Sequence, residues 1–179
     1  MNPSPTTTDA PRGRWAPLLL LFLIAGGATA NASPSAVHDV ADVLDRLHAA
    51  AAQSATEAYF GLFAPDAVFV GTDVAERWDL AQFRRYAEPL FAKGRGWVYT
   101  VRERHISVGR VPCGCVAWFD EVLDNAKYGT SRGTGMLLRT ADGWRIEQYA
   151  LTFPLPNDLA EELTRRIRDF EHPRQTPAP

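Results

Sequence analysis

The sequence predicts an α+β domain, with helices in its first half and an antiparallel β-sheet in its second half. In residues 37–51 and 80–91, apolar side chains recur at every third or fourth position, which is typical of helices with one buried face. From residue 96 to residue 153 the apolar period falls to two in four successive segments, as in a β-meander. Several of these segments are apolar on both faces. We therefore expect helices to cover one face of the sheet and a second copy of the chain, in a homodimer, to cover the other.

The first 30 residues are expected to be a secretory signal peptide. Arg12 and Arg14 precede an apolar stretch that is shorter than the roughly 20 residues of a membrane-spanning helix. Residues 28–30, Ala-Thr-Ala, have the small-residue pattern of a cleavage site, and the alternative is a retained anchor. We therefore expect an exported protein, periplasmic or secreted, with no membrane attachment after cleavage. Its domain would cover residues 31–170, followed by a disordered tail over 171–179.

Composition and motifs exclude several functional classes. The chain carries 19 basic and 21 acidic side chains, a net charge of −2, so it offers no basic surface for nucleic acid. None of its four histidines (His38, His48, His105 and His172) has a second ligand residue at metal-site spacing, so no metal is expected. Dinucleotide and phosphate-binding glycine motifs and local serine or cysteine triad signatures are absent, so no cofactor is expected.

Three helices are expected before the sheet. Ser35 can cap the first helix, and Thr56 can begin a short second one. Asp79 can cap a third helix that ends at Gly94, and Pro89 should kink this helix because proline removes a backbone donor from its interior.

The strands are expected over residues 66–73, 96–109, 113–124, 131–140 and 143–153, and a final helix over residues 158–169. Thr140 to Gly143 form a tight hairpin turn between the last two strands. If the two strands pair regularly through that turn, residues 133, 135 and 137 lie on the same face as residues 146, 148 and 150. We therefore expect Gln148, Ala150 and Thr152 to face a cavity.

Cys113 and Cys115 are predicted to be small buried residues on one face of a strand. Their Cα atoms would lie about 6.6 Å apart at strand rise, near the upper limit for a disulfide. A bulge at Gly114 would relieve this distance, so an intramolecular redox pair is the alternative.

Five segments resemble a SnoaL-like family of the nuclear transport factor 2-like superfamily, in a branch without assigned activity. They are DAVFVGTDVAERW (66–78), AKGRGWVYT (92–100), AWFDEVLD (117–124), RGTGMLL (132–138) and WRIEQYALTFPLPNDLA (144–160). The resemblance implies a cone-shaped fold, in which a strongly bent antiparallel sheet wraps around the N-terminal helices and leaves a pocket at its open end. It also implies frequent dimers. It does not imply one function, because this fold hosts isomerases, hydrolases, cyclases and binding proteins.

Ketosteroid isomerase, an enzyme of this superfamily, needs a carboxylate base, a tyrosine and a protonated aspartic acid. A gapless overlay places Gly71 at the position of the base, with Asp73 two residues further on. The helix tyrosine falls near Leu47, beside His48. Two of the three roles are therefore unfilled, and we do not expect this chemistry.

Asp120 and Glu121 are the candidate acid–base groups, and they point to opposite faces of one strand. One of them should face inward, where apolar walls would raise its pKa. The residues that could assist it are Arg132, Tyr149 and Gln148. The alternative is a structural ion pair with Arg132, Arg77 or Arg139.

Aromatic residues are abundant and can wall an apolar ligand site. The candidate ligand-binding residues are Tyr59, Phe63, Trp78, Trp97, Trp118, Gln148, Tyr149 and Thr152. A polar loop cluster of Thr72, Asp73, Glu76 and Arg77 lies near the expected mouth of the cone, or serves only to fix its own loop.

The leading hypothesis is an exported, dimeric cone-fold protein that binds a small, largely apolar molecule. The alternative is an isomerase, hydrolase or dehydratase that uses Asp120 or Glu121. A third possibility is an interaction module whose open sheet face meets another protein.

Overall fold

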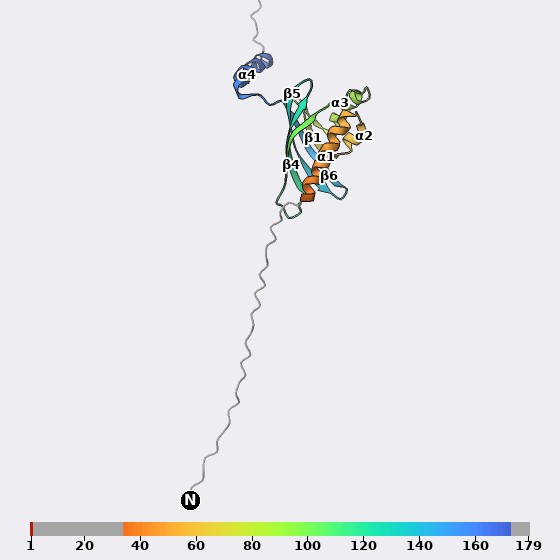
Figure 1. Cartoon of the computed structure of the whole chain (residues 1–179), viewed down its shortest axis with the longest axis vertical. Coiled ribbons are helices and arrows are strands. Elements are labelled where there is room, and N and C mark those ends of the chain that lie inside the picture. Colours follow the sequence, from red (N-terminus) through yellow and green to blue (C-terminus); the bar gives the residue numbers. More distant parts are fainter. Residues whose placement is uncertain (2–33, 173–179) are drawn as a thin grey trace, which may run out of the picture.

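The structure of the chain is a computed structural model that describes Met1 and residues 34–172. These residues form six strands and four helices (Figure 1). In chain order the elements are α1 (Pro34–Ala52), α2 (Thr56–Phe60), β1 (Phe63–Val70), β2 (Arg77–Asp79), α3 (Leu80–Phe91), β3 (Thr100–Val108), β4 (Val116–Asn125), β5 (Gly129–Thr140), β6 (Gly143–Thr152) and α4 (Asn157–Glu171). The predicted α+β class is confirmed. The predicted signal peptide (apart from Met1) and most of the predicted tail lie outside the described residues. Among the described residues, no helix is long and apolar enough to span a membrane.

The six strands form one sheet in the order β2-β1-β6-β5-β4-β3. The last four strands form the antiparallel meander that the sequence predicts. Two features of the sheet were not predicted: the short strand β2, and the parallel pairing of β1 with β6 at one side of the meander.

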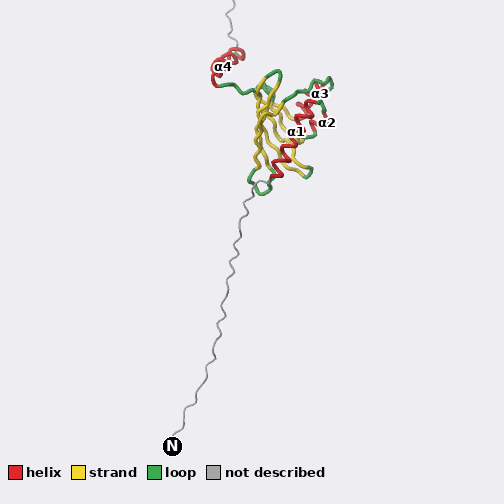
Figure 2. Tube along the Cα trace, in the orientation of Figure 1, coloured by secondary structure: helices red, strands yellow, loops and turns green. Residues whose placement is uncertain are grey.

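The sheet curves around α1, which lies against its inner face, so that the core forms between them (Figures 1 and 2). Gly133 and Gly135 on β5 face this inner side. A Cβ atom on Gly135 would lie 2.8 Å from the ring of Phe119, and one on Gly133 would lie 3.0 Å from Glu121 Cγ. Both positions therefore have room only for glycine, because bulkier neighbouring side chains fill the inside of the bend.

Helix α3 begins as the sequence predicts, at an N-cap formed by Asp79. The Asp79 carboxylate accepts a hydrogen bond from Gln82 N at 2.7 Å, and Asp79 N donates to Gln82 Oε1 at 3.0 Å, a reciprocal capping box. Helix α1 begins at Pro34, one residue before the predicted cap Ser35, so Ser35 lies inside the helix.

Strand β6 contains a bulge that the periodicity argument missed. Leu137 pairs with Ile146, but Met136 pairs with Gln148, which leaves Glu147 as an extra residue in β6. The inward-facing positions beyond the bulge are therefore Tyr149 and Leu151. The prediction that Gln148, Ala150 and Thr152 face the cavity is wrong, because a one-residue shift moves every following side chain to the other face.

Cys113 and Cys115 form a disulfide in the loop between β3 and β4. Strand β4 begins at Val116, so neither cysteine lies in a strand as predicted. Gly114 between them has φ = +54°, and this turn brings their Cα atoms to 5.1 Å. The prediction of two small, buried, unbridged residues is wrong, and the alternative, an intramolecular cysteine pair allowed by a distortion at Gly114, agrees with the disulfide.

Helix α4 stands away from the rest of the domain (Figure 1). It extends to Glu171, beyond the predicted end at residue 169, and it buries none of its residues. Leu159, Ile167 and Phe170 are exposed on it.

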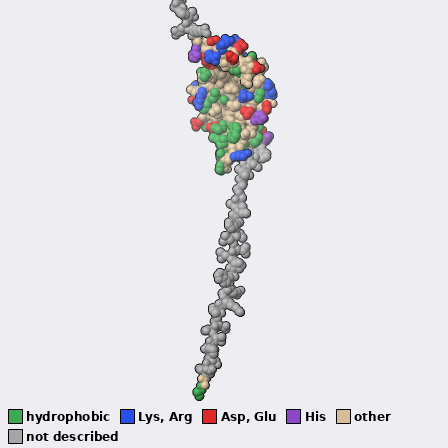
Figure 3. All heavy atoms as spheres, turned by 90° about the vertical axis from the view of Figure 1, so that its left-hand side faces the viewer, with side chains coloured by type: hydrophobic (Ala, Val, Ile, Leu, Met, Phe, Trp, Pro, Cys, Tyr) green, Lys and Arg blue, Asp and Glu red, His purple; other side chains and the backbone are tan. Residues whose placement is uncertain are grey.

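The outer face of the sheet carries the side chains that alternate with the core residues of β4 and β5. Trp118 and Met136 are paired neighbours on this face, 51% and 38% exposed, and Figure 3 shows hydrophobic side chains gathered toward one end of this side of the molecule. An exposed apolar area of this kind is typical of interaction surfaces.

Candidate functional site

An aromatic cleft of about 420 Å³ opens between α3, β1, β6 and the segment before β3. Eight of its twelve lining residues are aromatic, and rings from different elements stack: the rings of Trp78 and Tyr86 lie 4.8 Å apart and those of Phe69 and Phe83 lie 3.8 Å apart. The lining residues are Phe69, Gly71, Thr72, Glu76, Trp78, Phe83, Tyr86, Trp97, Tyr99, Tyr128, Leu151 and Phe153.

A small inner cavity of about 20 Å³ adjoins the cleft. The two spaces share four lining residues: Phe69, Trp97, Tyr99 and Leu151. His48 and Tyr149 line only the inner cavity. A volume of this size accommodates one water molecule or one small group of a ligand whose bulk occupies the cleft.

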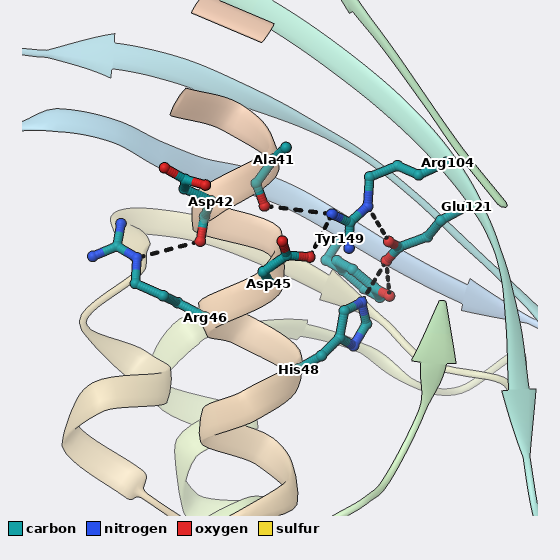
Figure 4. A network of polar contacts seen from close by, with 8 residues as sticks. All are labelled: Ala41, Asp42, Asp45, Arg46, His48, Arg104, Glu121 and Tyr149. Carbon is teal, nitrogen blue, oxygen red and sulfur yellow. Dashed lines mark hydrogen bonds and ion pairs between the residues drawn. The ribbon is translucent and has the colours of Figure 1, made fainter. Parts of the chain in front are cut away.

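Behind the inner cavity, Glu121 lies at the centre of a buried polar network (Figure 4). Its side chain is fully buried and accepts three hydrogen bonds: from His48 Nε2 at 2.8 Å, from Arg104 Nε at 2.8 Å and from the Tyr149 hydroxyl at 3.0 Å. The donors come from α1, β3 and β6, and Glu121 itself lies on β4. One carboxylate therefore joins the first helix to three strands of the sheet.

Arg104 extends the network to the surface of α1. Its Nη1 donates to Asp45 Oδ1 at 2.7 Å and to the backbone oxygen of Ala41 at 3.4 Å. Arg104 thus lies between one buried and one exposed carboxylate, with only 11% of its own side chain exposed. Buried arginine needs such pairing because its charge cannot be removed by deprotonation.

These contacts fix the charge of the network. Burial alone raises the pKa of the Glu121 carboxyl, but the hydrogen bonds and positive charges of His48 and Arg104 outweigh it and hold the pKa below its ordinary value. Burial raises the pKa of the Tyr149 hydroxyl well above its usual range, and the adjacent Glu121 charge raises it further. At neutral pH Glu121 is therefore an anion and Tyr149 keeps its proton.

An ionised Glu121 can only accept hydrogen bonds, so the proton between it and His48 lies on His48 Nε2. Among the described residues, nothing hydrogen-bonds to the other ring nitrogen, Nδ1. His48 is thus oriented through Nε2 by a buried carboxylate, and it also lines the inner cavity.

The structure brings only part of the predicted site together. Trp78, Trp97, Thr72 and Glu76 line the cleft, and Tyr59 and Tyr149 line the inner cavity. Phe63 lies in the core and lines neither space. In the predicted loop cluster, Asp73 Oδ1 accepts a hydrogen bond from Ala75 N at 2.8 Å, which fixes the turn, and Arg77 is exposed at the start of β2.

Five further predicted residues lie outside the site, on the outer face of the sheet: Trp118, Asp120, Arg132, Gln148 and Thr152. Asp120 is exposed and is paired in the sheet with His105 and Thr134, so it is excluded as a cavity acid. Glu121 is the inward-facing member of the pair. The predicted ion-pair partners Arg132, Arg77 and Arg139 are wrong, because strand pairing places Arg104 opposite Glu121 instead.

Arg104 was missed, although β3 contains a signal for it. Ile106 and Val108 are spaced by two from Arg104 and face inward with it, so a charged residue occurs within an apolar row. The sequence cannot show that the row belongs beside Glu121, because that depends on the register between β3 and β4.

A charged depression of about 710 Å³ also lies on the surface, between α1 and the β5–β6 turn. Its lining includes seven charged side chains: Asp39, Asp42, Asp45, Arg46, Arg139, Asp142 and Arg145. Within the described residues, no group of three or more His, Cys, Asp or Glu side chains is placed to hold a metal ion. The cleft is therefore the better candidate for a ligand site, because ligand sites are mostly apolar and concave.

Comparison with known proteins identifies the fold. A model of the SnoaL-like domain matches residues 40–156, and no curated protein matches the chain. An NTF2-like protein of unknown function from Pseudomonas putida KT2440 superposes with a TM-score of 0.59 at 14% identity, over 72% of this chain and 93% of that one. A candidate dehydratase of the NTF2-like family from Streptomyces avermitilis superposes with a TM-score of 0.58 at 15% identity, over 68% of this chain and 98% of that one. A domain of unknown function with a cystatin-like fold from Nostoc punctiforme PCC 73102 superposes with a TM-score of 0.57 at 13% identity, over 78% of this chain and 96% of that one. At these identities the likeness shows the fold alone.

Proposed function

Because the chain belongs to the SnoaL-like domain family, whose fold is a ligand-binding or isomerase/dehydratase-type scaffold, we propose that it binds a small, largely apolar molecule in the aromatic cleft. The observation that carries this proposal is the lining of the cleft, in which aromatic rings form most of the wall. A cleft of about 420 Å³ is within the size range of small-molecule sites.

The ligand's polar groups would be few. Glu76 and Thr72 contribute polar atoms on one side, and Tyr99 contributes a hydroxyl near the inner cavity. Glu76 Oε2 already accepts a hydrogen bond from Asp73 N at 3.2 Å. A neutral aromatic or alicyclic molecule with one or two hydrogen-bonding groups would fit this lining, whereas an anion would be repelled by Glu76.

Calorimetric titration with 2-naphthol and a panel of neutral aromatic and alicyclic compounds tests the proposal. We expect saturable binding at one site per chain. Trp78→Ala should weaken it at least about tenfold, because an aromatic wall of the cleft is lost. Trp118→Ala, which removes a tryptophan from the outer face, is the matched control and should leave binding unchanged. Absence of saturable binding across the panel, or equal weakening by both substitutions, would contradict the proposal.

We also propose that the protein is exported and acts as a homodimer. Support for export comes from the leader-like residues 1–30 and from the Cys113–Cys115 disulfide, since disulfides persist in oxidising compartments. Support for the dimer comes from Trp118 and Met136, which are exposed side by side on the outer face of the sheet. Two-fold pairing of one such patch on itself is the simplest closed assembly.

A further inference from the structure

We propose that the Cys113–Cys115 disulfide is a redox-active site, which exchanges with a pair of thiols on another polypeptide and so transfers a disulfide to it. This site is separate from the proposed ligand site. The two cysteines precede the start of β4 at Val116, whereas Tyr128, which lines the aromatic cleft, follows the other end of that strand. The inference therefore does not depend on what the cleft binds.

The first argument is access. The two cysteines lie in the loop that joins β3 to β4, residues 109–115, where Cys113 is exposed and Cys115 is partly buried. Exposed disulfides exchange more readily with external thiols, because an attacking thiolate must reach a sulfur atom. The loop contains one charged side chain, that of Arg110, so an incoming thiolate meets no negative charge within the loop. Cys113 is therefore the residue that offers its sulfur to attack.

The second argument is that the fold does not need this bond as a staple. The bond encloses only Gly114, and a disulfide stabilises a fold more when it closes a longer loop. Backbone hydrogen bonds already fix the loop. Gly109 N donates to Val116 O at 2.7 Å across its base, and Arg139 N on β5 donates to Cys115 O at 2.8 Å. Opening the disulfide would therefore leave β3, β4 and β5 joined as they are.

The third argument is that the loop keeps the two cysteines adjacent. Gly114 has φ = +54°, which glycine adopts without steric cost, and Gly114 N donates to Val111 O at 2.9 Å. In this turn the Cα atoms of Cys113 and Cys115 lie 5.1 Å apart, within the range of a disulfide. After reduction, the backbone contacts would keep one thiol beside the other, as in a reactive cysteine with a resolving partner.

The proposed exchange is balanced. A thiolate of the substrate polypeptide attacks Cys113 Sγ, the bond to Cys115 breaks, and Cys115 leaves as a thiolate. A second thiolate of the substrate then attacks the substrate sulfur of this mixed disulfide, and Cys113 leaves as a thiolate. The substrate is oxidised to a disulfide, this protein is reduced by the same two electrons, and its two thiolates take up the protons that the substrate thiols lost. A small-molecule disulfide, such as oxidised glutathione, restores the Cys113–Cys115 bond by the same kind of exchange.

Reduction of the unaltered protein is the first test. Reduced glutathione at millimolar concentration, without denaturant, should open the bond in most chains, and alkylation followed by mass spectrometry should detect both cysteines as free thiols. A disulfide that serves only as a structural link resists reduction by glutathione. A bond that stays closed under these conditions would overturn the inference without any substitution.

Turnover is the second test. A synthetic peptide with two cysteines is incubated with oxidised glutathione, and closure of the peptide disulfide is followed by chromatography. We expect catalytic amounts of the protein to accelerate closure at least about tenfold. Cys113→Ser should remove the acceleration, whereas Val74→Ser, in the exposed loop between β1 and β2, is the control and should retain it. No acceleration by the unaltered protein, or full acceleration by Cys113→Ser, would overturn the inference.

The two single variants identify the attacked sulfur. In Cys115→Ser, the remaining Cys113 has no neighbouring thiol to displace a partner, so a mixed disulfide with glutathione should accumulate and be detected by its mass. We expect this at least about tenfold faster than at Cys115 in Cys113→Ser, because Cys115 is partly buried. Equal or faster reaction at Cys115 would contradict the assignment of Cys113 as the attacked residue.

Discussion

Arg104 Nε donates to Glu121 Oε2 at 2.8 Å, from positions that lie directly opposite each other on β3 and β4. The pair is buried beneath α1, and His48 and Asp45 of that helix bind its two ends. The sheet and the first helix are thus joined by one charged network beside the inner cavity.

Glu121→Gln should lower the free energy of unfolding by about 3 kcal/mol, because the buried Arg104 charge loses its buried anionic partner and keeps only the exposed carboxylate of Asp45. Urea unfolding at neutral pH measures the change. Glu103→Gln is the matched control on the neighbouring strand, where Glu103 pairs with His105 in an exposed position, and it should cost less than about 0.5 kcal/mol. Equal costs for the two substitutions would show that the buried pair adds nothing to stability.

Stability should fall in acid partly through Glu121. Its pKa in the folded protein lies below the ordinary value of 4.5, so the folded carboxyl binds its proton more weakly than the unfolded one. Its stabilising contribution is therefore complete above about pH 4.5 and is lost as the pH falls through the folded value. Urea unfolding over a pH series should show a shallower decline below about pH 4.5 for Glu121→Gln than for the unaltered protein. Parallel declines would contradict this assignment.

Gly135→Ala should destabilise the fold by about 2 kcal/mol through overpacking. The added Cβ would contact the backbone oxygen of Gln148 and would lie 2.8 Å from the ring of Phe119, and the sheet backbone cannot move aside. Thermal unfolding measures the loss. Thr134→Ala, at the adjacent position on the outer face, should cost less than about 1 kcal/mol. If Gly135→Ala were as stable as the unaltered protein, the bend of β5 would have to be looser than described.

Trp118→Asp should convert the proposed dimer into a monomer, because it places a charge at the centre of a surface that pairs with itself. Sedimentation velocity measures the assembly. Val74→Asp adds the same charge in the loop between β1 and β2, where Val74 is 94% exposed, and should leave the dimer intact. A monomeric unaltered protein, or a dimer that survives Trp118→Asp, would contradict pairing through this face.

Sequence periodicity located most elements because it follows from local geometry. The α1 and α3 stripes, the Asp79 cap and the turn at Thr140–Gly143 each depend on residues within one helical turn or one hairpin. In β6 the same periodicity predicted the wrong inward-facing residues, because it does not allow for the bulge at Glu147. One unpaired residue reversed the faces of Gln148 and Tyr149, and nothing in the local alternation marks it.

The sequence by itself determined the α+β class, the meander, the family resemblance and the fact that one carboxylate of the Asp120–Glu121 pair must face inward, since all of these follow from order and period along the chain. Only the tertiary structure decided that Glu121 is the inward residue, that Arg104 and His48 are its partners, and that His48 lines the inner cavity. These relationships join residues 17 and 73 positions apart in the chain. They depend on strand register and on the placement of α1 against the sheet, and hydrophobic period does not encode either.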